Sequence, residues 1–223
     1  EESIGSSVGI ILGYVLVKGV VARLRGNVQV SNKEDYLKAH QKFVLYLRAF
    51  ESDYYSTDPN SYSFEYGFAR TLSKKLDTNV CAIGMTKEVD APRGATRVYV
   101  SDESWQTDVK ELMQKASMIF ILMSDRQSCI WEIAQSADML RKTCFLIDNE
   151  HKYENIRKEL RSTITFPEYG ELSSKLNDDI LKEKLENNVV KIGLMLNEDG
   201  YSVVEIDEAE KESIRKVFDA IGC

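Results

Sequence analysis

The stretch ASMIFILMSDRQSCIWEIAQSADMLRKTCFLI, residues 116–147, decides the fold. It holds two short apolar runs, Ser117–Met123 and Thr143–Ile147, of the kind found in strands buried on both faces of a parallel sheet. Between these runs, apolar residues recur every three or four positions and form a single helical stripe: Ile130, Ile133, Ala134, Ala137 and Leu140. The stretch therefore predicts a strand, a helix and a second, parallel strand.

The same alternation of strands and helices continues on both sides of this stretch. Upstream, the predicted strands are Phe43–Phe50, Asn79–Met85 and Val98–Val100, and the predicted helices are residues 64–76 and residues 105–116. Downstream, the sequence predicts a helix at residues 172–180, a hairpin that turns at Asp199 and Gly200, and a last helix at residues 208–221. The predicted fold class is α/β: a flavodoxin-like parallel sheet flanked by helices.

The first 26 residues differ from the rest in composition. The run Ile4–Ala22 is almost wholly apolar and ends in the positive residues Lys18, Arg23 and Arg25, which favour the cytoplasmic side of a membrane. We interpret residues 1–26 as an apolar helix that anchors the chain to the cytoplasmic face of a membrane; a buried helix of a cytoplasmic protein is the alternative. Residues 27–41 are predicted as a linker, 42–165 as the α/β domain, and 166–223 as a C-terminal α/β extension packed on that domain.

Composition excludes several classes of function. The net charge of −7 and the lack of a basic cluster argue against nucleic-acid binding. The four cysteines form no CxxC pair, and two of them lie in apolar runs, which suits a reducing compartment. With only two histidines, far apart, we expect neither a metal site nor a Ser-His-Asp triad, and no cofactor is predicted.

The loops that follow the predicted strands are rich in polar residues: Glu51–Asp53, Gly84–Gly94, Ser124–Ser128 and Asp148–Glu150. Loops at the carboxyl ends of parallel strands meet at one edge, where ligands bind. Glu132 follows the third loop and lies off the apolar stripe, in what the spacing predicts as the first helical turn, where the helix dipole keeps a carboxylate ionised. The alternative is that Glu132 only starts the helix, and that Trp131 only borders the core.

The order of elements in residues 42–148 resembles a Toll/interleukin receptor (TIR) domain. FVLYLRAFESD resembles the first strand of that family and its acidic turn. The segment from Ala116 to Ile147 resembles its strand, Ser-containing loop, Trp, and helix glutamate. The adjacency of Trp131 and Glu132, and Arg48 inside the first strand, depart from the family pattern.

In the enzymatic branch of the TIR family, the helix glutamate is catalytic, and the resemblance implies this role for Glu132. It also implies a set of substrate-binding residues, with serines and an aspartate on ribose or phosphate, Arg93 or Arg97 on phosphate and a tryptophan on a ring: Ser52, Asp53, Arg93, Trp105, Ser124, Ser128 and Trp131. One carboxylate suffices for this reaction. Its negative charge stabilises the oxocarbenium-like charge on the sugar, and nicotinamide, which is cationic while attached, leaves as a neutral molecule.

Three functions remain open from the sequence. The first is a bacterial enzyme that cleaves or rearranges NAD or a related nucleotide at the N-glycosidic bond, in defence or stress signalling. The second is a non-catalytic TIR-like module at the membrane that senses a nucleotide or self-associates. The third is a membrane-tethered scaffold in which the edge residues only cap helices.

Overall fold

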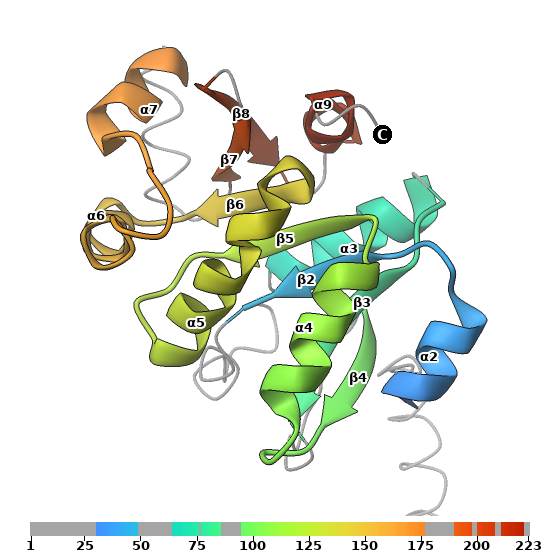
Figure 1. Ribbon diagram of the computed structural model, residues 1–223. Helices are drawn as coiled ribbons and strands as arrows, with labels where there is room; N and C mark the ends of the chain where they lie inside the picture. Colours follow the sequence, from blue (N-terminus) through green and yellow to red (C-terminus); the bar gives the residue numbers. More distant parts are fainter. Residues whose placement is uncertain are drawn as a thin grey trace, which may run out of the picture.

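A computed structural model describes residues 30–48, 64–75, 77–85, 95–176, 190–197, 200–207 and 211–220. Within these ranges, eight strands form one sheet in the order β1-β4-β3-β2-β5-β6-β7-β8 (Figure 1). The strands are β1 Val30–Asn32, β2 Val44–Leu47, β3 Val80–Met85, β4 Thr96–Val100, β5 Met118–Leu122, β6 Thr143–Ile147, β7 Val190–Asn197 and β8 Gly200–Asp207. Strands β1 to β6 are parallel, whereas β7 and β8 join antiparallel at one side.

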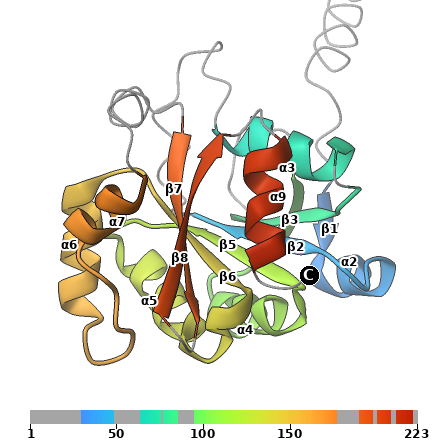
Figure 2. The same cartoon turned by 90° about the horizontal axis from the view of Figure 1, so that it is seen from above.

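Helices cover both faces of the sheet (Figures 1 and 2). Their bounds are α2 Lys33–Ala39, α3 Phe64–Lys75, α4 Trp105–Lys115, α5 Gln127–Gln135, η2 Ser136–Lys142 (a 3-10 helix), α6 Glu150–Glu159, α7 Tyr169–Leu176 and α9 Lys211–Ala220. Helices α4, α5 and α6 bury Val109, Ile133 and Ile156 in the apolar cluster on one face. Helices α3 and α9 bury Leu72 and Val217 in the cluster on the other face. The α/β class and the mostly parallel sheet are confirmed.

The direction in which successive strands are added to the sheet reverses at its centre. From β2 it passes through α3, on one face, to β3; after β4 it crosses through α4, on the other face, to β5. Strand β2 thus lies between β3 and β5, and β3-β2-β5-β6 is the order of a flavodoxin-like sheet. At such a switch point the two connections leave a crevice beyond the carboxyl ends of the strands. Here the switch lies between β2 and β5.

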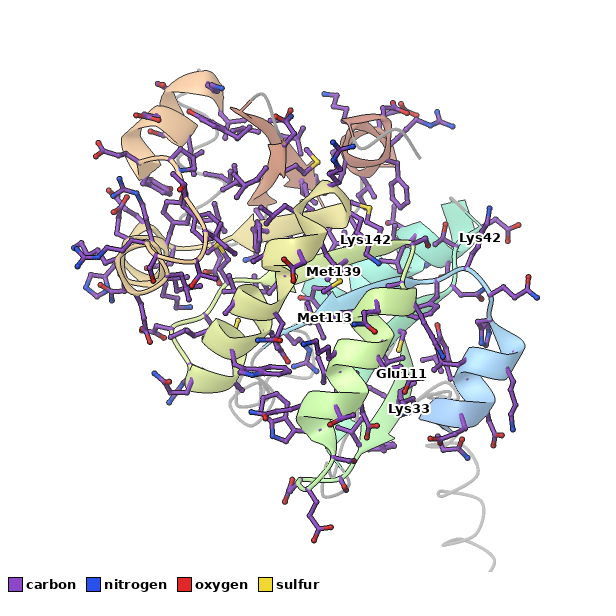
Figure 3. The ribbon with its side chains drawn as sticks, in the orientation of Figure 1. Lys33, Lys42, Glu111, Met113, Met139 and Lys142 are labelled. Carbon is purple, nitrogen blue, oxygen red and sulfur yellow. The ribbon has the colours of Figure 1, made fainter. Side chains whose placement is uncertain are left out.

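The predicted strands and the hairpin are present, but three segments differ from expectation. Residues 30–39, predicted as linker, form β1 and α2, and Lys33 of α2 reaches α4 with its Nζ 2.6 Å from Glu111 Oε2 (Figure 3). Helix α6 was not predicted. In place of the single helix expected over residues 130–140, α5 ends at Gln135 and the 3-10 helix η2 follows, with a non-helical φ of −130° at Met139.

The predicted apolar helix at residues 1–26 lies outside the described residues. None of the helices within the described ranges is long and apolar enough to cross a membrane.

Candidate functional site

Glu132 is a buried residue of α5, with only 1% of its surface exposed. The sequence predicted that it would lie in the first turn and point away from the core, and both expectations are wrong. Helix α5 begins at Gln127, so Glu132 lies in the second turn, beyond the strongest effect of the helix dipole. The buried arc of α5 is also wider than the predicted stripe, because it includes Cys129, from which Glu132 is rotated by only about 60°.

The burial of Glu132 changes its chemistry. Its Oε2 atom is inaccessible to solvent and has no hydrogen-bond partner among the described residues. Burial disfavours the charged carboxylate and raises the pKa of Glu132 to about 8. The expectation that this carboxylate stays ionised is therefore wrong for the ligand-free protein, in which Glu132 is mostly protonated at pH 7. Strongly shifted pKa values are enriched at functional sites, and purely structural burial produces them as well.

Cys129 shares the buried side of α5 with Glu132. The Cys129 thiol, three residues before it, donates a 3.4 Å hydrogen bond to the carbonyl of Leu122 at the end of β5. Burial raises the pKa of Cys129 far above its usual range, and Glu132, Asp125 and Asp148 raise it further when they are ionised. This thiol is therefore protonated and a poor nucleophile.

Asp148 follows β6 and contributes a second incompletely bonded carboxylate. Its Oδ1 is buried without a hydrogen-bond partner among the described residues, and its Oδ2 is 3.7 Å from Lys152 Nζ. The carboxyl ends of β5 and β6 thus carry more acceptor oxygens than the described donors satisfy.

Ser124 and Ser128 lie in the same strand–turn–helix unit as Glu132. Ser124 follows the end of β5, and its Oγ accepts a long, 3.4 Å hydrogen bond from the backbone N–H of Arg126 at the start of α5. Ser128 is half-buried and precedes Glu132 by one helical turn, which places both on the same side of α5. Three of the predicted site residues, Ser124, Ser128 and Glu132, therefore belong to one strand–turn–helix unit.

The two tryptophans lie elsewhere. Trp105 of α4 and Trp131 of α5 are half-buried and contact each other edge to face, with ring centroids 4.8 Å apart. Trp131 lines an open hollow of about 490 Å³ between α4 and α5, and Glu132 is not part of its lining. Its other lining residues are mainly polar: Gln106, Thr107, Lys110, Glu111, Gln114 and Gln135. Within the part of the chain that the structure describes, this hollow therefore holds Trp131 without Glu132.

The remaining predicted residues divide into two groups. Ser52, Asp53 and Arg93 lie outside the described residues. Arg97, considered as a phosphate ligand, is fully buried in the amino-terminal half of β4, far from the carboxyl edge. A candidate that the sequence reasoning missed is Arg48, which directly follows β2 at the switch point and is 8% exposed. The sequence contained a signal for Arg48, because a charged residue at the carboxyl end of an apolar strand indicates a structural or functional role.

Within the described ranges, no group of His, Cys, Asp and Glu side chains is arranged to hold a metal ion.

No protein-family model matches the chain, and no curated protein matches it. Among solved structures, the C-terminal domain of the coenzyme A biosynthesis bifunctional protein CoaBC is similar to it, with a TM-score of 0.35 and 14% sequence identity. The similarity covers 88% of this chain and 96% of that one. A TM-score of this size does not establish a shared fold, and it carries no functional conclusion.

Proposed function

We propose that this chain is a TIR-like protein that cleaves or rearranges NAD or a related nucleotide at the N-glycosidic bond, with Glu132 as the catalytic carboxylate. The observation that supports it best is the buried Glu132 carboxyl, whose Oε2 lacks a partner among the described residues, on the helix that follows β5 at the switch point. A ligand that reached this carboxyl would supply the missing partner.

The raised pKa of Glu132 is compatible with this role. A nicotinamide riboside unit carries a positive charge, and a positive charge beside a buried carboxyl favours the ionised form. Binding would therefore release the proton from Glu132, and the resulting carboxylate would stabilise the positive charge that spreads over the ribose as the bond to nicotinamide breaks. The nicotinamide leaves as a neutral molecule, so a general acid is unnecessary. Water or another nucleophile then takes the ribosyl group.

The test is incubation of the full chain with NAD, free and on membranes, followed by chromatographic detection of nicotinamide. Wild-type protein should release nicotinamide. Glu132→Gln keeps the size of the side chain, cannot ionise, and should lose at least about 100-fold in rate, because electrostatic stabilisers of this kind contribute that much. Glu159→Gln, an exposed glutamate of α6, is the matched control and should retain full activity. Equal activity of the Glu132→Gln variant would rule out this role.

A second candidate is a non-catalytic nucleotide-binding module. It is favoured by the 1% exposure of Glu132 and by the contact between the two tryptophans, which occupies part of each ring surface. This candidate predicts that NAD or a related nucleotide raises the melting temperature without nicotinamide release. Anchoring at the cytoplasmic face of a membrane, self-association, and a role in bacterial defence or stress signalling are further parts of the proposal, and they depend on the sequence alone.

A further inference from the structure

Strand β8 is the last strand of the sheet among those the structure describes. All its residues pair with β7 in one continuous register, from Asn197 opposite Gly200 to Val190 opposite Asp207. Because no residue is skipped, the strand has no β-bulge, and its sequence GYSVVEID has no proline or lysine. Bulges, prolines and lysines are the usual means by which proteins prevent an edge strand from pairing with another chain.

The hairpin geometry determines which backbone groups of β8 point outward. Only residues 198 and 199 separate the paired residues Asn197 and Gly200, and the pair that closes a two-residue hairpin is hydrogen-bonded. Since hydrogen bonding alternates along an antiparallel pair, Ser202, Val204 and Ile206 then bond to β7. The backbone N–H and C=O groups of the odd-numbered residues of β8 point away from β7.

An independent contact agrees with this assignment. Ser213, in the first turn of α9, accepts a hydrogen bond from the backbone N–H of Asp207 at 3.1 Å. The same hydroxyl donates to the carbonyl of Asp207 at 3.0 Å. Both backbone groups of Asp207 therefore face α9 rather than β7. The outward groups at this end of β8 are already bonded within the chain, and those of Val203 and Tyr201 lie further along the same edge.

Both faces of β8 are packed, so the edge is the part of the strand that remains for a partner. On one face, Lys175 of α7 lies over the ring of Tyr201, 3.7 Å from its centroid. On the other face, Ile206 is fully buried with Ile214 and Val217 of α9, which lies alongside β8 (Figure 2).

We propose that β8 pairs with β8 of a second copy of this chain, antiparallel, about a two-fold axis perpendicular to the sheet at Val203. Val203 then lies opposite the partner's Val203, and the two residues exchange a pair of N–H···O=C hydrogen bonds. Tyr201 lies opposite the partner's Glu205. The two sheets become one continuous sheet through the dimer.

Charge and side-chain shape favour this arrangement. The acidic residues of β8, Glu205 and Asp207, lie at one end of the strand, and the antiparallel arrangement moves them to opposite ends of the contact. A parallel pair would place Glu205 beside the partner's Glu205, and like charges opposite each other destabilise a sheet. Valine, at the centre of the contact, is a β-branched residue of the kind enriched in strands. Because the contact involves about five residues on each strand, the interface is small and the dimer should dissociate on dilution.

The test is the mass of the full chain, with detergent present, by light scattering over a series of concentrations. Wild-type protein should change from the 25.4 kDa monomer to a dimer as its concentration rises. Val203→Pro removes the outward N–H of Val203 and no hydrogen bond to β7, so it should remain monomeric with an unchanged circular dichroism spectrum. Val203→Thr keeps the N–H and the branched shape, and should dimerise like wild type.

A wild type that stays monomeric at every soluble concentration overturns the proposal, as does a Val203→Pro variant that still dimerises. Growth beyond a dimer also overturns it, because the two-fold pairing is closed.

Hydrogen exchange tests the wild-type protein directly and applies if the proline variant fails to fold. The amides of Tyr201 and Val203 should exchange more slowly in concentrated than in dilute protein, whereas those of Ser202 and Val204 should not change. Equal protection of all four amides at both concentrations would show that the edge is covered from within its own chain.

Discussion

Replacement of Glu132 by glutamine should make the protein more stable at neutral and alkaline pH. The pKa of Glu132 is raised from 4.5 to about 8 in the folded protein, whereas in the unfolded chain it returns to the ordinary value. Between these values the folded state binds more protons than the unfolded state, so the free energy of unfolding falls as pH rises. The loss is about 1.4 kcal/mol per pH unit, and about 5 kcal/mol for the whole shift.

The assay is urea unfolding followed by tryptophan fluorescence, which reports on the packed pair Trp105 and Trp131. Wild type and Glu132→Gln are compared from pH 5 to pH 8. Groups that titrate in both proteins cancel in the difference, which isolates Glu132. The variant should be similar to wild type at pH 5 and more stable by about 3 kcal/mol at pH 7, or about 6–12 °C in melting temperature.

The exposed Glu159→Gln control should show a difference from wild type that does not depend on pH. If the difference between Glu132→Gln and wild type also stayed constant from pH 5 to pH 8, Glu132 would titrate normally. The carboxyl would then be hydrated or paired, and its burial would no longer support a functional site at Glu132.

Two further substitutions test the packing around the site. Lys142 donates from Nζ to the carbonyls of Gln114 and Ala116, both at 2.8 Å, and so binds η2 to the end of α4 (Figure 3). Lys142→Met should therefore lower the free energy of unfolding by about 1–3 kcal/mol in denaturant titrations. An unchanged free energy would show that water replaces the lysine. Gly193→Ala would place its Cβ 2.6 Å from Ile206 Cδ1 and 3.0 Å from Val204 Cγ2. The substitution should reduce the melting temperature by an amount equivalent to about 1–3 kcal/mol. An unchanged melting temperature would show that these side chains can move aside.

The central sheet was predictable because its strands are apolar on both faces. The run Ser117–Met123 contains β5, and the predicted hairpin is present as β7 and β8, although Gly200, predicted in the turn, is already paired with Asn197. The sequence analysis did not predict helices α2 and α6, because neither has a strong apolar stripe. Each is marked instead by a capping residue at its start. Asn32 and Asn149 each accept a hydrogen bond from the backbone N–H three residues later, at 2.8 and 3.0 Å. Asparagine before a charged helical segment is a signal that the sequence already contained.

The alternation of strands and helices predicted that the loops after the strands share one edge of the sheet, but it did not predict which strands are neighbours. The structure places the ends of β2 and β5 side by side. The burial of Glu132 did not follow from periodicity, because the predicted stripe started at Ile130 and left out Cys129. A cysteine acts as a small apolar residue, and counting it as one brings the edge of the buried arc to within about 60° of Glu132.

The strand order also has a consequence for how the chain folds during synthesis. Strand β2 pairs on one side with β5, so that Val44 contacts Met118, and this side cannot close before residue 118 has left the ribosome. Among the strands that the structure describes, β1 is made first and pairs only with β4, where Val30 lies opposite Arg97. By contrast, β5, β6, β7 and β8 are added outward in chain order. Strands β2, β3 and β4 can likewise pair in chain order. At translation rates of about 5–20 residues per second, the other side of β2 therefore waits several seconds for β5, whereas β6, β7 and β8 can be added one strand at a time.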